Sequence, residues 1–216
     1  MPYRLIHTAR IASIMLFVYC AAEVAFIWNS LQMLSFLNLV ETSSDQAAID
    51  AQAERIDGIA IFVGGFFIFA VVASFVSGGM WIYRACANSL AVRPNPEAIT
   101  PGWAVGWFAV PFANLWMPFK AMRQTWNGLH GNPDLDGPVP VWMRAWWGFW
   151  LLGNMVSILA NRINLDAVTL NDYRTGSSLD LVSSVLSIGA ALLFRHLIVT
   201  LTRVSAEAQK MDEVFA

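Results

Sequence analysis

The stretch Ile59–Ile82 reads IAIFVGGFFIFAVVASFVSGGMWI and contains no charged side chain. About 20 consecutive apolar residues are needed for a helix to cross the hydrocarbon core of a bilayer. Within it, Ala70, Ser74 and Gly78 recur every four residues, so small side chains follow one helical face along which a second helix can approach closely. The stretch therefore predicts a membrane-spanning helix with a packing face.

The composition of the whole chain agrees with this. Of 216 residues, 57% are hydrophobic and 13% are charged, whereas a soluble domain has about a quarter of its residues charged. The 13 basic and 15 acidic residues nearly balance, which argues against nucleic acid as a partner. We therefore expect an all-α membrane protein whose residues 1–216 form a single membrane domain, with the lipid bilayer as its main partner.

Three further apolar stretches are long enough to cross: Ile11–Leu31, Trp142–Asn161 and Leu179–Val199. The first could instead be a signal peptide, because Cys20, Ala21 and Ala22 resemble a small-residue cleavage site. Apolar residues continue to Leu39, however, and this favours a retained span. In the last stretch, Ser183, Ser187 and Ala191 share one face, which predicts close packing against another helix.

Two connecting segments have unusual compositions. Glu41–Asp57 holds five carboxylates and one base, which predicts an acidic exterior loop. Inside it, Ser43 and Gln46 fit a capping box, so a short exposed helix is expected over Ala47–Ile56.

Pro101–Leu129 is rich in Trp and Pro and is interrupted at Pro111. Beyond that proline the apolar residues fall on one helical face and the polar residues lie largely elsewhere, which predicts an amphipathic helix at the membrane interface. The apolar set is Phe112, Leu115, Trp116, Phe119, Met122, Trp126 and Leu129, and the polar set is Asn114, Lys120, Arg123, Gln124 and Asn127. We expect Pro101–Leu129 to be re-entrant or interfacial.

The distribution of basic residues distinguishes two topologies. If Trp103–Phe119 crosses the membrane, there are five spans and the bases divide almost evenly between the two sides. If it re-enters, there are four spans, and ten bases lie inside against Arg55, Arg162 and Arg174 outside. The inner ten are Arg4, Arg10, Arg84, Arg93, Lys120, Arg123, Arg144, Arg195, Arg203 and Lys210. The positive-inside rule favours four spans, with both termini in the cytoplasm and the acidic segment outside.

Three blocks carry a resemblance to a known family: WIYRACANSL from Trp81, TPGWAVGWFAVPFANLWMPFKAMRQTW from Thr100, and WWGFWLLGN from Trp146. Over about Trp81 to Asn154 the chain resembles a bacterial membrane family, domain of unknown function 4328 (DUF4328). The resemblance implies a protein of the bacterial inner membrane and implies no activity. The positions that match its recurring pattern are Trp81, Arg84, Asn88, Pro101, Gly102, Trp103, Gly106, Trp107, Pro111, Asn114, Pro118, Met122, Trp126 and Asn154.

Glu23 is the first candidate site residue. It lies twelve residues into the first span, about 18 Å along the helix at 1.5 Å per residue, and ionisable groups at that depth are costly and often functional. We expect Glu23 to be uncharged and to face other helices, with Asn154 and Ser187 as hydrogen-bonding partners. The plainer alternative is a neutral acid with a purely structural bond.

The other candidates are amides and an arginine. Arg84 and Asn88 are one helical turn apart at the end of the second span and, with Asn114 at the proline break, could line an inward-facing site for a lipid phosphate. A snorkelling arginine and amides that tie down loop backbone are the simpler interpretation. Asn154, in the middle of its span, predicts an interhelical hydrogen bond.

The sequence contains no H-E-x-x-H, G-x-S-x-G or Walker A pattern, so we expect no catalytic residues, metal or cofactor. Three functions stay open. The first is a non-enzymatic accessory subunit that packs against a membrane-protein partner or a second copy. The second is a binder or transporter of a lipid, ion or small molecule that uses Glu23 and the polar groups near Pro111. The third, and least favoured, is an enzyme acting on lipid.

Overall fold

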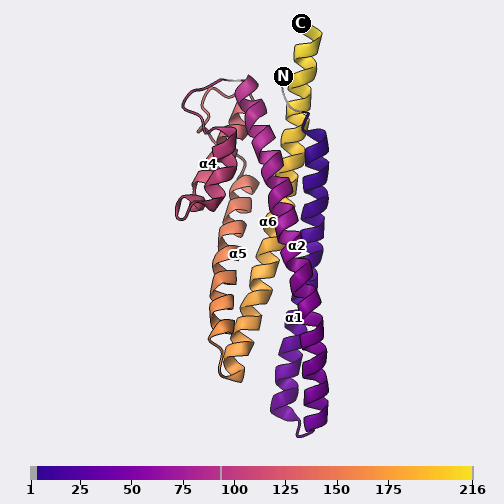
Figure 1. Cartoon of the computed structure of the whole chain (residues 1–216). Coiled ribbons are helices and arrows are strands. Elements are labelled where there is room, and N and C mark those ends of the chain that lie inside the picture. Colours follow the sequence, from indigo (N-terminus) through magenta and orange to yellow (C-terminus); the bar gives the residue numbers. More distant parts are fainter. Residues whose placement is uncertain (1–3, 93, 216) are drawn as a thin grey trace. The chain divides into compact units, whose positions relative to one another are not determined.

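A computed structural model describes residues 4–92 and 94–215, with side chains to Glu207. Every element in this part of the chain is helical, which confirms the all-α prediction (Figure 1). The main helices are α1 (Ile6–Thr42), α2 (Gln46–Val92), α4 (Met117–Leu129), α5 (Val141–Leu165) and α6 (Leu170–Phe215). Between α2 and α4 lie the short α3 (Pro101–Gly106), η1 (Trp107–Ala109) and η2 (Ala113–Leu115).

The acidic segment is not a separate loop, so that prediction is wrong. The connection after α1 is three residues long, and the carboxylates from Asp50 to Asp57 lie in the first turns of α2. The cap also differs from the one predicted, because Asp45 Oδ1 accepts the backbone N–H of Ala48 at 3.2 Å and Gln46 bonds Asp50 instead. No proline lies between Ala47 and Ile82 to break the helix, so it continues through Asp57 and Gly58 into the apolar stretch.

The polar stretch between the last two predicted spans, residues 162–178, is also mostly helical. Only Asp166–Thr169 separates α5 from α6. Thr169 caps α6 by a reciprocal capping box: its hydroxyl accepts the N–H of Asp172 at 3.2 Å, and the Asp172 carboxylate accepts the N–H of Thr169 at 2.9 Å. Polarity marked the end of the apolar stretch correctly, but it did not mark the end of the helix.

Within the described residues, three helices are long and apolar enough to cross a membrane: α1, α2 and Leu170–Glu207 of α6. The fourth predicted span lies in α5, which is not among them. Its 25 residues would extend about 37 Å at 1.5 Å per residue, so length is not the obstacle. The Trp, Asn and Arg residues along it reduce its mean hydropathy.

The chain forms two compact units, and each draws on distant parts of the sequence. The first contains residues 1–16, 73–147 and 192–216, and the second contains residues 17–72 and 148–191. Charge divides between them. The described bases of the first unit are Arg4, Arg10, Arg84, Lys120, Arg123, Arg144, Arg195 and Arg203, whereas the second unit has only Arg55, Arg162 and Arg174. Arg93 and the side chain of Lys210 lie outside the described residues.

In the first unit, small residues of α2 bring its neighbours close. Ser74 Oγ donates to the Met15 carbonyl of α1 at 2.9 Å. A methyl group added at Gly78 would lie 3.3 Å from the Phe194 ring of α6. The prediction that this stripe is a packing face is confirmed, because its residues contact other helices of the same chain.

Candidate functional site

Glu23 lies in a buried polar cluster of the second unit. Its side chain is 3% exposed. The carboxyl is hydrogen-bonded to the hydroxyls of Tyr19, one turn earlier on α1, and of Ser184 and Ser187 on α6. Small serine side chains at this point allow α6 to come close enough for these bonds. Glu23 therefore faces another helix, as predicted, and Ser187 is one of the partners expected from the sequence.

The charged neighbour of this cluster is a second acid. Asp180, one helical turn before Ser184 on α6, acts electrostatically on Glu23 and accepts a hydrogen bond from Asn164 Nδ2 at 3.0 Å. Like charges that are close and shielded from water repel each other strongly. The second unit therefore brings two carboxyl groups to a place where hydroxyl and amide groups are their hydrogen-bonding partners among the described residues.

The face of α6 next to this cluster packs on α5. Ser183 Oγ donates to the Gly153 carbonyl at 3.2 Å. A methyl group at Gly153 would lie 3.3 Å from Ser187 Oγ, and one at Gly189 would meet the Phe149 ring at 2.8 Å. The predicted packing role of Ser183 and Ser187 is confirmed, and it holds the hydroxyls that reach Glu23 in place.

Asn154 does not join the cluster, and the prediction of an interhelical bond there is wrong. Its side chain is exposed and its Nδ2 donates to the Trp150 carbonyl one turn earlier on α5 at 2.7 Å. Gly153, the adjacent residue, occupies the face toward α6. Successive residues of a helix point about 100° apart, so Asn154 is turned away from that face.

The three residues of the predicted inner site lie in different surroundings. Asn88 is buried in the first unit, and its Nδ2 donates to Ser205 Oγ of α6 at 3.0 Å, so its amide ties two helices together. Trp81 makes a similar bond, from Nε1 to Thr202 Oγ1 at 3.1 Å. Arg84 is half-buried near the end of α2, and Asn114 is half-buried in η2. This bond of Asn88 joins two helices, whereas the simpler interpretation expected a bond to loop backbone.

Helix α4 is amphipathic, but the protein covers much of its polar face. Gln124 and Asn127 are buried. Asn127 Nδ2 donates to the carbonyls of Leu135 and Gly137 at 3.2 and 3.1 Å, so the helix holds the loop that follows it. Met122 and Leu129, predicted to face lipid, are buried too. The prediction therefore fails for Met122 and Leu129 of α4, whereas Phe112, Leu115 and Trp116 of the same predicted face are exposed.

The same loop carries an ion-pair group. Asp136 accepts a hydrogen bond from Arg123 at 2.8 Å and lies 3.8 Å from Lys120 Nζ. Partial burial by itself raises the pKa of the Asp136 carboxyl, but the Arg123 hydrogen bond and the two positive charges outweigh it and hold the pKa below its usual value. Gly131, with φ 70°, ends α4 and lets the chain turn back into this loop.

Tyr19, Ser184, Asp180 and Asn164 were missed from the sequence as members of the Glu23 cluster. Tyr19 could have been found, since residues four apart share a helical face and Glu23 was already singled out. The α6 and α5 residues could not, because helix register across a packed interface is not visible in local periodicity. The described residues contain no group of three or more His, Cys, Asp and Glu side chains placed to hold a metal ion.

The fold and the cluster define a class: a helical protein with membrane-capable helices and a buried acid, Glu23, between two of them. The chain belongs to the family described as Domain of unknown function (DUF4328), whose family description matches residues 44–203. The match confirms the resemblance seen in the sequence and extends it to the start of α2 and through most of α6. Searches of curated proteins and of solved structures each found no match.

Proposed function

We propose that the protein is a non-enzymatic multi-pass membrane protein that binds a small cation, either a proton or a monovalent metal ion, at Glu23. The observation that carries this proposal is the Glu23 carboxyl, 3% exposed and surrounded by the hydroxyls of Tyr19, Ser184 and Ser187. A carboxyl in apolar surroundings is stable when it is protonated or paired with a cation. A hydroxyl group can donate a hydrogen bond to the carboxyl, or its oxygen can face a bound ion. The cluster therefore suits both the protonated carboxyl and the carboxylate paired with a cation.

Asp180 strengthens the proposal. A second acid near Glu23 makes uptake of one positive charge more favourable, because a cation relieves the repulsion between the two carboxylates. A residue whose role is only to join helices seldom needs a second acid beside it, since a neutral amide such as Asn88 joins two helices in the first unit. Ionisable residues inside membrane helices mark ion and proton pathways in other proteins.

Unfolding of the purified full chain in detergent micelles tests cation binding. Saturating a site with ligand at 100 times its Kd stabilises a protein by about 2.7 kcal/mol. We expect Na⁺ or K⁺ to raise the unfolding midpoint relative to a bulky organic cation at equal ionic strength. Glu23→Gln should abolish the increase, whereas Glu54→Gln, at an exposed acid of α2, should retain it.

A proton as the ligand gives a different result in the same experiment. Metal ions would then have no effect on the midpoint, and the infrared band of the protonated Glu23 carboxyl would be present at neutral pH and absent from Glu23→Gln. If neither the cation effect nor that band is seen, Glu23 is a structural residue and the proposal fails.

An accessory role is the second candidate, and α2 favours it. Only 6% of its most apolar 18-residue window is buried within the chain, with large side chains such as Phe62 and Ile61 exposed. The small-residue faces of α2 and α6, which first suggested a protein partner, pack on other helices of the same chain. Lipid would therefore cover the exposed surface of α2 as well as a protein partner would. Purification from native membranes in mild detergent tests the role, and a stoichiometric protein partner is the expected result if α2 forms an interface.

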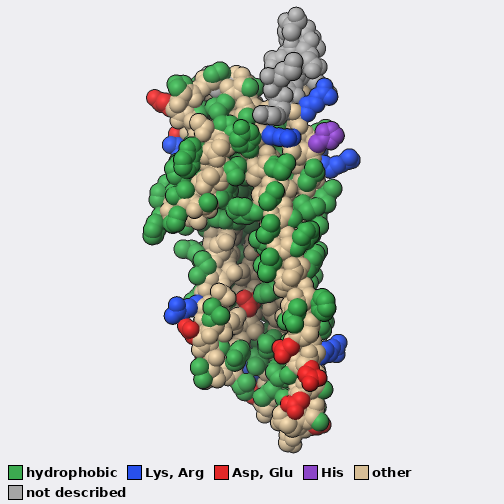
Figure 2. All heavy atoms as spheres, viewed as in Figure 1, with side chains coloured by type: hydrophobic (Ala, Val, Ile, Leu, Met, Phe, Trp, Pro, Cys, Tyr) green, Lys and Arg blue, Asp and Glu red, His purple; other side chains and the backbone are tan. Residues whose placement is uncertain are grey.

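We further propose a bacterial inner-membrane topology with four spans, of which α5 is one, and both termini in the cytoplasm. The supporting feature is the charge division: the second unit has acids at the α1–α2 turn, which Figure 2 shows gathered in red, and few bases. Reporter fusions after Asp50 and at Ala216 should report opposite sides of the membrane. A periplasmic signal at Ala216 would instead require an odd number of spans.

A further inference from the structure

The segment between α2 and α4 contains an exposed apolar surface. Residues 98–119 include no charged side chain. Four large apolar residues in it are exposed: Trp103 by 52%, Phe112 by 78%, Leu115 by 41% and Trp116 by 56%. Side chains of this size rarely gather on a water-facing loop unless they contact a partner or a membrane.

Four successive backbone N–H groups of this segment are hydrogen-bonded within the chain. After the proline, the N–H groups of Ala113, Asn114, Leu115 and Trp116 donate to carbonyls of residues 110–113 at 2.7–3.2 Å. The Leu115 carbonyl accepts a bond from Trp147 Nε1 of α5 at 3.0 Å. Pro111 has no N–H to satisfy. Irregular backbone can enter a bilayer only when its polar groups are satisfied in this way.

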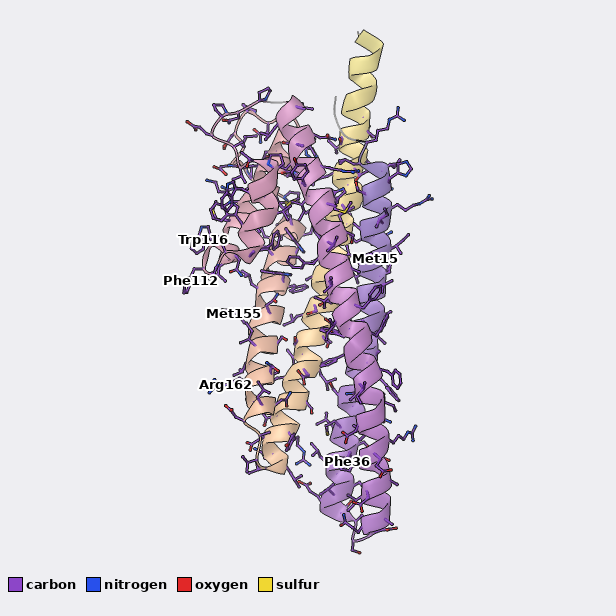
Figure 3. All side chains as sticks on the ribbon, viewed as in Figure 1. Met15, Phe36, Phe112, Trp116, Met155 and Arg162 are labelled. Carbon is purple, nitrogen blue, oxygen red and sulfur yellow. The ribbon has the colours of Figure 1, made fainter. Side chains whose placement is uncertain are left out.

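Phe112 adopts a conformation that a folded chain rarely gives a bulky residue. Its φ is 61°, and such backbone strain costs about 1–3 kcal/mol. The strain turns the ring outward, and Figure 3 shows Phe112 and Trp116 projecting from the same side of the segment, away from the helices. Interactions that these rings make with their surroundings can offset that cost.

The segment that carries this apolar surface packs on a membrane-capable helix. In the first unit, the Phe108 ring contacts the Phe75 ring of α2 edge to face, with centroids 5.7 Å apart. A methyl group at Gly79 of α2 would lie 3.3 Å from Val105. Phe75 is itself 54% exposed on α2, where only lipid or another helix can cover it.

We propose that the turn Pro111–Trp116 is inserted into the lipid bilayer, with Phe112, Leu115 and Trp116 in contact with acyl chains near the headgroup boundary. The structure thus assigns membrane contact to the irregular turn and not to Met122 and Leu129 of α4, which are buried in the protein. Trp is suited to this depth because its ring is apolar and its N–H is polar. The occupant of the surface is lipid, and the segment is a re-entrant element that does not cross.

Photocrosslinking of the full chain tests this insertion. A benzophenone amino acid replaces Phe112 or Trp116, and the matched control replaces Pro133, which is exposed in the polar loop after α4. The purified variants are reconstituted in vesicles of phosphatidylethanolamine and phosphatidylglycerol and irradiated. We expect phospholipid adducts at Phe112 and Trp116 by intact mass, at least about fivefold above the control position.

Two results would overturn the proposal. Crosslinks from Phe112 and Trp116 to a second copy of the chain would make the turn a protein interface. Adducts no more frequent than at Pro133 would place the turn in water. Phe112→Gly, which removes the ring and tolerates the positive φ, provides a folding control, since its detergent-solubilised form should retain the wild-type circular dichroism spectrum.

Discussion

The two units bury polar groups of different kinds. The first unit pairs neutral side chains, as in Trp81 with Thr202 and Asn88 with Ser205. The second unit buries the acid Glu23 among hydroxyls, with Asp180 nearby. A neutral donor and acceptor satisfy each other and need nothing further, whereas a buried carboxyl has two charge states and a cost that depends on which one is present. The comparison teaches that the buried polar groups of the first unit are neutral pairs that join helices, whereas those of the second unit include an ionisable carboxyl.

The largest expected effect comes from Trp81 in the first unit. Its side chain is completely buried, and it contacts the Phe194 ring edge to face in addition to its bond with Thr202. Trp81→Ala should lower the free energy of unfolding by about 3–5 kcal/mol because it leaves a large cavity. Detergent-titrated unfolding measures this loss. Trp81→Phe keeps most of the ring and should lose much less, and equal losses for both variants would assign the effect to the hydrogen bond.

Glu23 provides the corresponding test in the second unit. Glu23→Leu removes the group that three hydroxyls contact, and we expect a loss of about 1–3 kcal/mol in unfolding free energy. Glu23→Gln keeps an acceptor and should stay near the wild-type value while losing the cation effect. If Glu23→Leu is as stable as the wild type, the hydroxyls satisfy themselves on their own helices and the cluster is not a unit.

A pair of asparagines sharpens the comparison further. Asn88→Ala removes a buried interhelical bond and should lower the unfolding free energy by about 1 kcal/mol. Asn154→Ala changes an exposed side chain that bonds only its own helix and should have an effect close to zero. The opposite order would show that Asn154 makes contacts outside this chain.

The smallest expected effect belongs to Asp136, because exposed ion pairs contribute at most about 1 kcal/mol. Its pKa is held below the usual value, so its stabilising contribution is fully present above the ordinary carboxyl pKa of about 3.9. That contribution disappears as the pH falls through the lower folded value. Hydrogen exchange of residues 131–137 should show this loss, and Asp136→Asn should exchange faster at neutral pH and lose the pH dependence.

The sequence alone determined the class and the positions of the apolar helices. Uncharged stretches such as Ile59–Ile82 are long and apolar enough to cross a bilayer, and that property depends on composition and length alone. The family could also be recognised from the sequence, because each of its matching blocks is a continuous run of residues. The helix ends could not be predicted in the same way, because a polar residue can border an apolar stretch without ending the helix, as at Asp57 and Asn161.

Only the tertiary structure decided which polar residues act together. Glu23 stood out in the sequence because its neighbours along the chain are apolar, and the structure places it in the cluster. Asn154 stood out for the same reason, yet the face toward α6 belongs to Gly153. The buried polar face of α4 depends on a loop that folds back onto it. In each case the outcome depends on the register and rotation of packed helices, which are set by contacts between residues far apart in the chain.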